Sequence, residues 1–468
     1  MLTLLAIFFL QFADKAGSDV VCLSTTAIEM REERGIAIDS LDYAVSPVYL
    51  DSVKQLGARV LHTSRWMNGA TIEASKETIE AISKCGFVDG VYLTRNDDEA
   101  ASISARSINK HIVEEAQEGP GDDYVLQTTN EQLQLYNLLP LHRAGYKGKG
   151  IRIGVADGGF YRADSLDWLP REQWLGYADL TDDTDGIFGR TGNHGSLCLG
   201  TIVARRSDYE GAATEASYYL FKTEEAATES IKEIDNWVAA IEMADSLGLH
   251  IVSTSLGYTT FDDEATNWSY ADMDGKTSRG AQAAVIAARK GMLLVVAMGN
   301  DGAKAWHYLS TPADADSILS VGAVNREGTI AKFSSYGPSA DGRVKPEVCA
   351  LGEGTTLLDV NNGNVFPGNG TSFACPLIAG MAACLWSALP EASNMAIREM
   401  IIRSADRYTQ PQEQYGYGIP DAWKAYTEAT TGVDAPSICK GYQKWINENG
   451  QMYILYNGNI YNVLGYRL

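Results

Sequence analysis

The sequence is short of positive charge and lacks paired cysteines. Lysine and arginine number 38 against 60 aspartates and glutamates in 468 residues, so the net charge is -22. A nucleic-acid binder needs a basic face, and we therefore expect no nucleic-acid partner. The seven cysteines show no CxxC spacing, and most stand among Val, Ala and Leu, where cysteine behaves as a small buried apolar residue. The pattern predicts neither a zinc site nor a disulfide framework.

The chain begins with an apolar run, Leu2–Leu10, that is too short to span a bilayer as a stable helix. We therefore expect no stable membrane span. No Lys or Arg precedes the run, although a signal peptide normally begins with one. Two interpretations remain: an atypical or truncated signal peptide over residues 1–12, which we favour, and the first strand of the domain that follows.

Residues 13–95 are predicted to form a small α+β unit. Asn68-Gly69 between two alternating segments is a strong hairpin signal, and Pro47 suits the first turn of a helix. The expected elements are a helix at 47–53, strands at 60–62 and 70–74, a helix at 76–84 and a strand at 88–93. A ferredoxin-like β-α-β-β-α-β sandwich is the natural closure. The polar, acidic stretch 96–127 is interpreted as an exposed linker.

The segment 128–430 is predicted to be a large α/β domain. Apolar runs at 151–156, 251–257 and 293–298 alternate with the helical patterns at 229–247 and 281–290. Such alternation is typical of a parallel sheet flanked by helices. In open sheets of this kind, functional residues gather beyond the carboxyl ends of the strands.

Four polar residues stand at such loop ends. Asp157 and Asn300 each follow a buried strand, His194 stands at the entrance of an apolar helix, and Ser372 lies in a glycine-rich turn. Pro376 is expected at the start of the next helix, where its missing amide costs nothing. Each residue also has a structural interpretation: the Asp157-Gly158 pair and Asn300 suit turns, and Ser372 suits a helix cap.

The acidic loop Asp179–Asp185 could bind calcium. It does not match the alternating loop with a distal glutamate that calcium-binding helix-loop-helix motifs use. We favour a solvated acidic face.

Together these residues resemble a subtilisin-like serine protease. The chain order Asp157, His194, Ser372 is the subtilisin order and differs from those of chymotrypsin and the α/β-hydrolases. The sequence Gly370-Thr371-Ser372-Phe373-Ala374 is not the G-x-S-x-G elbow of esterases, and His194 with Asn300 points away from sedolisins. The resemblance spans about residues 128–430. Further segments that match landmarks of the family are 255–257, 297–300, 333–338, 345–347 and 417–421.

The resemblance implies a secreted serine endopeptidase that hydrolyses peptide bonds through an acyl-enzyme. Asp157, His194 and Ser372 would form the triad, and Asn300 would bind the oxyanion. The implied substrate-binding residues are Ser255, Leu256, Gly257, Ala297, Met298 and Gly299. The chemistry needs no cofactor, although a structural calcium is compatible with it.

The implied partners are protein or peptide substrates and the protein's own N-terminal unit, which is similar to the inhibitory propeptides of this family. A monomer is expected. Gly158 and Cys375 depart from the usual Ser or Thr. The atypical N-terminus and Cys375 motivate the alternative, which is a non-catalytic binding protein on a subtilase scaffold.

The C-terminal tail, 431–468, is predicted to contain a hairpin. The segments 452–456 and 459–464 flank Asn457-Gly458, which is a common two-residue turn. The tail resembles short C-terminal segments on secreted proteins of Bacteroidetes-type bacteria. We therefore expect a secreted, periplasmic or cell-surface location.

Overall fold

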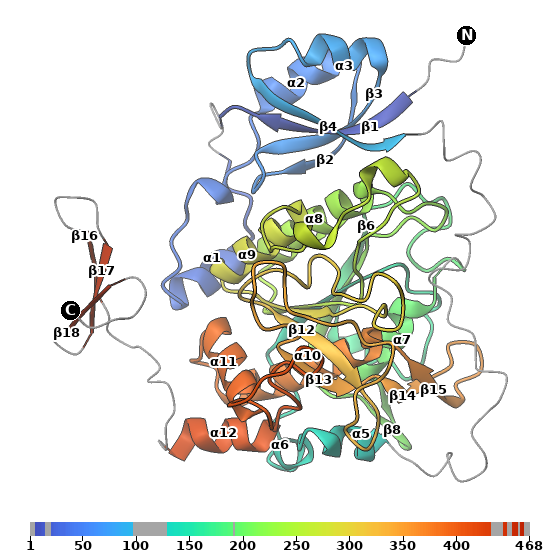
Figure 1. Cartoon of the computed structure of the whole chain (residues 1–468), viewed down its shortest axis with the longest axis vertical. Coiled ribbons are helices and arrows are strands. Elements are labelled where there is room, and N and C mark those ends of the chain that lie inside the picture. Colours follow the sequence, from blue (N-terminus) through green and yellow to red (C-terminus); the bar gives the residue numbers. More distant parts are fainter. Residues whose placement is uncertain are drawn as a thin grey trace. The chain divides into compact units, whose positions relative to one another are not determined.

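The centre of the larger domain is a parallel sheet of seven strands (Figure 1). The computed structural model describes residues 5–14, 20–96, 129–190 and 192–431, and three strands at 443–446, 452–456 and 459–462. The strand order is β13-β12-β11-β10-β5-β9-β6, and neighbouring strands run parallel. The strands are β5 Arg152–Asp157, β6 Trp174–Asp179, β9 Ser217–Lys222, β10 Ile251–Thr254, β11 Leu293–Ala297, β12 Leu319–Val324 and β13 Val348–Leu351. The predicted α/β class is confirmed.

Helices cover both faces of this sheet. Val252 and Val296 share a hydrophobic cluster with residues of α8 (Ile231–Ser246) and α9 (Arg279–Arg289). Ser253, the next residue along β10, points the other way, and its hydroxyl lies 3.6 Å from Cys375 Sγ on α10 (Thr371–Ala388). α7 (His194–Val203) packs beside α10.

α10 is apolar on all sides because the domain surrounds it. Among the described residues it is the one helix long and apolar enough to cross a membrane, but 89% of that window is buried inside the protein. A helix that is hydrophobic all round is either a membrane span or a core helix. This burial identifies α10 as the core helix of the large domain.

Shorter elements complete the large domain. The remaining helices are α5 Thr129–Leu135, α6 Leu139–Arg143, α11 Asn394–Ser404 and α12 Ala422–Thr431. The remaining strands form two antiparallel pairs, β7 Arg205–Arg206 with β8 Tyr209–Glu210 and β14 Glu353–Leu358 with β15 Val365–Asn369. Short 3-10 segments of this domain lie at Arg171–Gln173, Glu264–Thr266 and Tyr270–Asp272, and another, Ser40–Asp42, precedes α2 (Pro47–Gln55) in the N-terminal domain.

The N-terminal domain is an antiparallel sheet of four strands in the order β2-β3-β1-β4. Its elements are β1 Leu5–Phe12, α1 Thr25–Glu33, α2 Pro47–Gln55, β2 Arg59–Ser64, β3 Gly69–Ser75, α3 Lys76–Ile82 and β4 Val88–Asn96. Val53 of α2 and Ile79 of α3 pack against Leu10 and Ile72 of the sheet. The predicted β-α-β-β-α-β arrangement is confirmed, with α1 as an additional helix.

The favoured interpretation of the first apolar run is wrong for residues 5–12. These residues form β1, which pairs with both β3 and β4 in the interior of the sheet. Phe9 faces the cluster of α8 and α9, whereas Leu10 and Phe12 face α2 and α3. A strand buried on both faces reads as a continuous apolar run, and this is why it resembled a signal peptide. The N-terminal domain therefore includes β1 and does not begin at residue 13.

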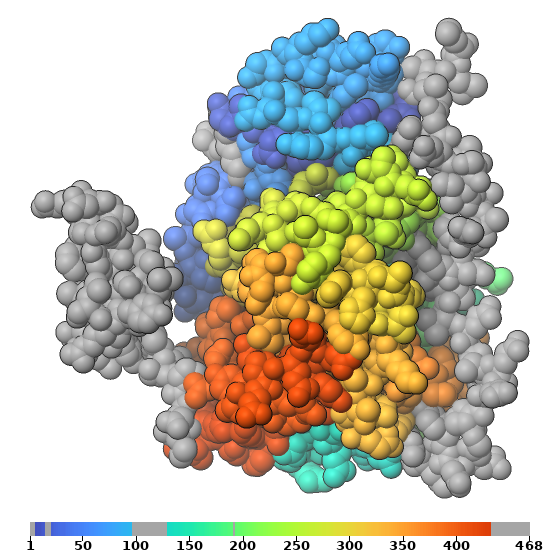
Figure 2. Space-filling view, in the orientation of Figure 1, coloured from blue at the N-terminus to red at the C-terminus, as the bar shows by residue number. Residues whose placement is uncertain are grey.

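The N-terminal domain contacts the large domain in two places. Trp66 and Met67, in the turn between β2 and β3, join the hydrophobic cluster of α8 and α9. A segment between β1 and α2, residues 20–42, forms the second contact, and we call it the arm. In Figure 2 the blue N-terminal residues adjoin the yellow-green residues that include α8.

The C-terminal unit, Thr427–Leu468, is described at the end of α12 and in three strands. β16 Gln443–Ile446, β17 Met452–Tyr456 and β18 Asn459–Asn462 form an antiparallel sheet. The pairing of β17 with β18 confirms the predicted hairpin, and β16 adds a strand to it. The predicted turn at 457–458 and most of the predicted linker at 96–127 lie outside the described residues.

Candidate active site

The candidate residues meet at the carboxyl edge of the parallel sheet. β5 ends at Asp157, β10 leads directly into Ser255, and β11 leads into Gly299 and Asn300. α7 and α10 begin at His194 and Thr371. A cavity of about 390 Å³ opens here, and its lining includes His194, Ser255, Leu256, Gly257, Ala297, Gly299, Asn300, Thr371 and Ser372.

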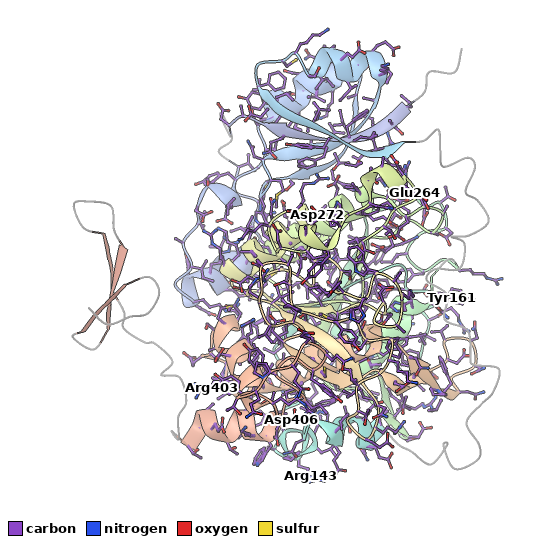
Figure 3. All side chains as sticks on the ribbon, in the orientation of Figure 1. Arg143, Tyr161, Glu264, Asp272, Arg403 and Asp406 are labelled. Atoms are coloured by element: carbon purple, nitrogen blue, oxygen red, sulfur yellow. The ribbon has the colours of Figure 1, made fainter. Side chains whose placement is uncertain are left out.

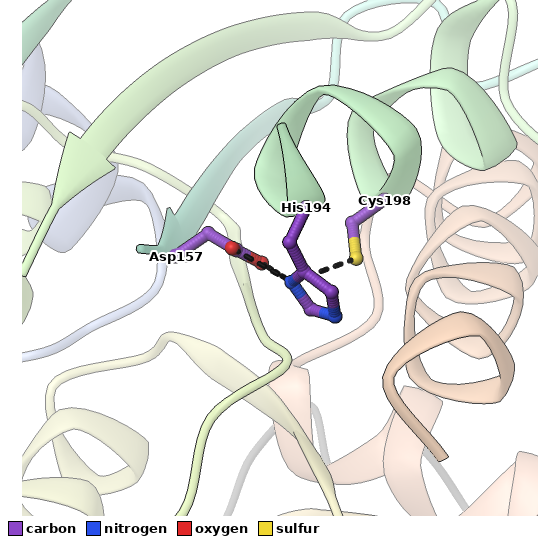
Figure 4. A group of neighbouring side chains, drawn as sticks. All are labelled: Asp157, His194 and Cys198. Atoms are coloured by element: carbon purple, nitrogen blue, oxygen red, sulfur yellow. Dashed lines mark hydrogen bonds and ion pairs between the residues drawn. The ribbon is translucent and has the colours of Figure 1, made fainter. Parts of the chain in front are cut away.

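Asp157 and His194 form a close pair (Figure 4). His194 Nδ1 lies 2.8 Å from Asp157 Oδ1 and 3.0 Å from Oδ2, and the Asp157 side chain is fully buried. The amide of Gly158 also donates to Asp157 Oδ1, at 2.8 Å. The carboxylate thus fixes the imidazole ring, and the Gly158 amide helps to fix the carboxylate.

The environment of His194 favours its protonated form. Burial opposes a charge on the ring, but the Asp157 carboxylate outweighs burial and raises the pKa of His194 well above its ordinary value. Nδ1 is engaged by Asp157, so Nε2 is the ring nitrogen left to exchange a proton in the cavity. A histidine held in this way is suited to act as a general base at neutral to alkaline pH.

Ser372 is the second residue of α10, so the helix begins five residues before Pro376 and not at it. The expected position of Pro376 is therefore wrong. A proline inside a helix has no amide to donate to the carbonyl four residues earlier, and that carbonyl belongs to Ser372. Two side chains donate to it instead: Ser255 Oγ at 2.7 Å and Cys198 Sγ at 3.4 Å. The proline and its two compensating donors fix the backbone of Ser372.

The Ser372 hydroxyl lies in the cavity and donates to the carbonyl of Ser255 at 3.3 Å. Among the described residues, no hydrogen bond joins this hydroxyl to His194. In enzymes without substrate, catalytic hydrogen bonds are often long or poorly aligned. Ser372 and His194 line the same cavity.

The side chain of Asn300 is oriented by Thr371. Asn300 Oδ1 accepts from the Thr371 amide at 2.9 Å and from the Thr371 hydroxyl at 3.0 Å. Since the oxygen is held by Thr371, Nδ2 is the group that remains to donate elsewhere. The Ser372 amide lies in the first turn of α10, ahead of the first intrahelical bonds. Two N–H donors are thus available beside the serine.

Cys198 is a residue of the site that sequence reasoning missed. It lies one helical turn after His194, and its Sγ is 3.8 Å from His194 Nδ1. The four-residue spacing on a helix could have indicated this proximity. Asp157, His194 and Cys198 would suit a metal ion by distance alone, but burial raises the pKa of the Cys198 thiol. A protonated thiol is a donor, which matches its contact with the Ser372 carbonyl.

Cys375 replaces the usual Ser or Thr, and its thiol contacts the backbone carbonyls around it. It is fully buried, and its Sγ contacts the carbonyls of Val295 at 3.2 Å and Thr254 at 3.4 Å. Burial raises the pKa of this thiol to about 12. Cys375 therefore supplies a weak thiol donor in the buried part of α10, at a position where the family usually has a hydroxyl.

The expected substrate-binding residues are split between the cavity and the core. Ser255, Leu256, Gly257, Ala297 and Gly299 line the cavity, whereas the Met298 side chain is fully buried in the core cluster of α8 and α9. Met298 therefore acts, at most, through its backbone. The cavity also contains Glu224, Glu229 and Lys304, which sequence reasoning did not single out because no motif marks them.

The acidic loop Asp179–Asp185 does not fit a calcium ion, because two buried lysines reach its carboxylates. Lys222 Nζ lies 2.8 Å from Asp183 and 3.6 Å from Asp185. Lys232 Nζ lies 3.1 Å from Asp182 and also contacts Glu225. Both ammonium groups are fully buried, so the loop is not the purely solvated face that we favoured.

Comparisons with known proteins identify the family of both domains. The model of the subtilase family matches residues 148–418, and the model of a peptidase S8 propeptide domain from Bacteroidota matches residues 8–110. A thermostable alkaline protease of Halalkalibacterium halodurans is 28% identical over 64% of this chain and 74% of that protein. The minor extracellular protease Epr of Bacillus subtilis is 29% identical over 67% of this chain but 45% of its own length.

Solved structures show the same fold. The crystal structure of MycP1 from Mycobacterium smegmatis superposes with a TM-score of 0.53 at 18% identity, over 71% of this chain and 94% of that one. The family match covers more than half of the chain, and the N-terminal match identifies a propeptide that inhibits its own protease. The chain therefore belongs to the subtilase family and is a subtilisin-like serine endopeptidase with an N-terminal propeptide.

Proposed function

We propose that Ser372, His194 and Asp157 are the catalytic triad of this endopeptidase. Ser372 Oγ attacks the carbonyl carbon of the scissile peptide bond, and His194 Nε2 accepts its proton. The same imidazolium then protonates the leaving amine, and water hydrolyses the acyl-enzyme by the reverse sequence. The observation that carries the proposal is the Asp157–His194 pair, which lies at a cavity also lined by Ser372 and Asn300.

The proposed oxyanion site consists of Asn300 Nδ2 and the Ser372 amide. Thr371 holds the Asn300 oxygen, so the amide nitrogen is available for the oxygen of the tetrahedral intermediate. Donors fixed in advance stabilise that charge without reorganisation. Loss of the equivalent asparagine in another subtilisin lowers turnover about 100- to 1,000-fold, and we expect a similar loss for Asn300→Ala.

The alternative is a non-catalytic binding protein on the same scaffold, and the close Asp157–His194 pair favours the enzyme. The Gly158 amide supports Asp157, and Cys375 makes contacts in place of the missing hydroxyl. We further propose that the enzyme is exported and acts as a monomer on protein or peptide substrates. The Bacteroidota propeptide match and an extracellular relative support export. The chemistry itself uses side chains and water alone.

The test compares Ser372→Ala with Ser165→Ala, an exposed serine outside the cavity. Each purified protein is assayed for casein hydrolysis and for labelling by a fluorophosphonate, which acylates activated serines. We expect Ser372→Ala to lose both signals and Ser165→Ala to keep both. Hydrolysis that persists undiminished in Ser372→Ala would exclude the assignment.

A further inference from the structure

We propose that the Ser310 hydroxyl makes the enzyme select, at the residue before the scissile bond, an uncharged polar side chain over an apolar one of similar shape. The inference rests on the proposed function, because it assigns a substrate class to the same cavity. Ser310 lines the cavity that contains His194 and Ser372, and it is 4% exposed. It lies outside every segment that the sequence marked for substrate binding.

Ser310 stands between the two segments that are expected to bind substrate, 255–257 and 297–299. A Cβ placed on Gly257 would collide with Ser310 Oγ, and a Cβ placed on Gly299 would lie 3.4 Å from the same oxygen. Ser310 therefore occupies the space that a side chain at Gly257 would need. Its hydroxyl lies close to both segments at once.

The backbone around Ser310 is held on both sides. The Leu309 amide donates to the carbonyl of Tyr336 at 3.0 Å, and Thr311 exchanges two backbone hydrogen bonds with Tyr258, at 2.9 and 3.2 Å. Tyr258 is the residue that follows the segment 255–257, so these bonds tie Ser310 to that segment. A group that is fixed in advance loses little conformational freedom when a substrate binds.

Ser310 supplies the one hydroxyl of the cavity lining that has no hydrogen-bond partner among the described residues. The Ser255 hydroxyl donates to the carbonyl of Ser372, and the Ser372 hydroxyl donates to the carbonyl of Ser255. The Thr371 hydroxyl donates to Asn300 Oδ1. An almost completely buried polar group without a partner calls for an explanation, and a substrate group that binds in the cavity supplies one.

The position of Ser310 identifies the substrate residue that it meets. In the proposed reaction, the attacked carbonyl lies between Ser372 Oγ and Asn300 Nδ2. Gly299 directly precedes Asn300 in the chain. The residue that supplies the attacked carbonyl therefore places its side chain beside Gly299, where the Ser310 hydroxyl lies.

A substrate side chain in this space displaces water from the Ser310 hydroxyl. An apolar side chain then leaves the hydroxyl unpaired, which is unfavourable in an almost completely buried position. A substrate hydroxyl or carboxamide restores the hydrogen bond, because the serine oxygen can both donate and accept. The Ser310 hydroxyl carries no charge, so it cannot offset the larger cost of burying a charged side chain. Sites built to bind a polar group reject analogues that lack it.

The test measures kcat/KM on three pairs of peptides that differ only at the residue before the scissile bond: Thr and Val, Asn and Leu, and Gln and Met. The two members of each pair are similar in shape, but one of them lacks the hydrogen-bonding group. The full chain is expressed and matured, and mass spectrometry of the products confirms which bond is cut. Wild type and Ser310→Ala are compared by the ratio of the polar to the apolar peptide, because intrinsic differences between the peptides cancel in this comparison.

We expect Ser310→Ala to lower this ratio about 3- to 10-fold in at least one pair. The substitution removes a hydrogen bond from the polar peptide and an unpaired hydroxyl from the complex with the apolar peptide. It removes a single oxygen that has no partner among the described residues, so the temperature of unfolding should stay at the wild-type value.

Ser269→Ala is the matched control. Ser269 is exposed and does not line the cavity, and its hydroxyl donates at 2.8 Å to Asp272, which is labelled in Figure 3. The control therefore also removes one serine hydroxyl from the protease domain. It should keep the wild-type ratio in all three pairs.

Two results would overturn the inference: ratios that Ser310→Ala leaves unchanged in all three pairs, or a fall of the same size in Ser269→Ala. Either result leaves the proposed function intact, provided that Ser372→Ala abolishes hydrolysis of all six peptides. Failure of the proposed function looks different, because hydrolysis of the peptides would then persist in Ser372→Ala.

Discussion

At the scale of single residues, the Asp157–His194 pair determines how activity depends on pH. The raised pKa of His194 means that the ring is protonated at low pH and cannot accept the Ser372 proton. Activity should therefore rise as pH increases through that pKa, and kcat/KM should be highest at alkaline pH. The ordinary pKa of histidine is about 6.5, and the rising limb should lie above it.

Asp157→Asn tests this dependence. The substitution removes the carboxylate that raises the pKa and leaves burial, which lowers it, so the rising limb should move to lower pH. The plateau should fall about 10,000-fold, the loss measured for the corresponding change in a trypsin-like triad. A pH profile of kcat/KM gives both quantities. A limb that stays at the wild-type pH would show that another group controls it.

The buried thiols provide a second residue-scale prediction. Because burial raises the pKa of Cys375 to about 12, almost none of it is thiolate at pH 8, and the thiolate is the reactive form. In the folded full-length chain, iodoacetamide should label Cys22 and Cys85, which are half-buried, and should label Cys375 only after unfolding. Peptide mass spectrometry identifies the labelled sites. Rapid native labelling of Cys375 would contradict its burial.

The residues that sequence reasoning found are those that motifs mark. Asp157, Asn300 and His194 stand at loop ends of predicted elements, and Ser372 stands in a glycine-rich turn. Sequence reasoning missed Cys198, and it missed the second role of Ser255, which was predicted only as a substrate-binding residue. Both roles depend on tertiary contacts between distant segments. Cys198 and Ser255 donate to the Ser372 carbonyl because Pro376 leaves it without an amide, and this requires knowledge of where α10 begins.

At the scale of elements, the acidic loop Asp179–Asp185 depends on lysines from β9 and α8. Burial opposes the charge of Asp182, yet Lys232 lowers its pKa. Lys222→Met should remove the buried ammonium group that pairs with the carboxylates of Asp183 and Asp185. Removal of one member of a buried pair costs about 3–5 kcal/mol, so the free energy of unfolding should fall by an amount of that order.

Denaturant unfolding of Lys222→Met, wild type and Lys149→Met measures this loss. Lys149 is exposed, and its substitution should have little effect. We expect the difference between Lys222→Met and wild type to be the same with added calcium and with a chelator. A difference that appears only when calcium is removed would instead identify the loop as a calcium site.

Sequence patterns predicted most helices and strands, but not which of their faces other elements cover. The hairpin at Asn68-Gly69 and the alternating strands and helices of the large domain were predicted because their signals are local. β1 was misinterpreted because a strand covered on both faces has the same apolar pattern as a signal peptide. α1 was not predicted because its charged sequence has no clear apolar face. Its position is explained by contacts with the large domain.

At the scale of the whole molecule, the propeptide contacts the protease domain through its sheet and through the arm. Asp245 of α8 connects the two contacts. Its carboxylate accepts from Arg65, in the turn between β2 and β3, at 2.7 Å and from Arg31 of the arm at 2.6 and 2.7 Å. Arg31 also pairs with Asp42, which in turn lies 2.9 Å from Lys290 of the protease domain. These side chains are almost completely buried.

The protease domain is shaped to receive the arm. Gly248, with a φ of +68°, faces α1, and a Cβ at this position would lie 3.0 Å from the Cα of Ala27. The Ser24 amide donates to the carbonyl of Ser246 at 2.8 Å, and the Arg34 guanidinium lies 4.9 Å from the centre of the Trp386 ring. The arm therefore adds a second, polar anchor to the apolar contact of the sheet.

Arg31→Ala should weaken the hold of the propeptide on the protease. It leaves Asp42 and Asp245 without one buried cation each, and breaking a buried pair costs about 3–5 kcal/mol, equivalent to a loss of affinity of at least about 100-fold. After cleavage of the connection, the variant should therefore release its propeptide, and gain activity, at higher protein concentration than wild type, that is, after less dilution. Arg59→Ala is the matched control, because Arg59 is exposed and pairs with Glu73 within the propeptide. Equal release by Arg31→Ala and Arg59→Ala would show that the sheet alone holds the propeptide, since only Arg31 belongs to the network that joins the arm to Asp245.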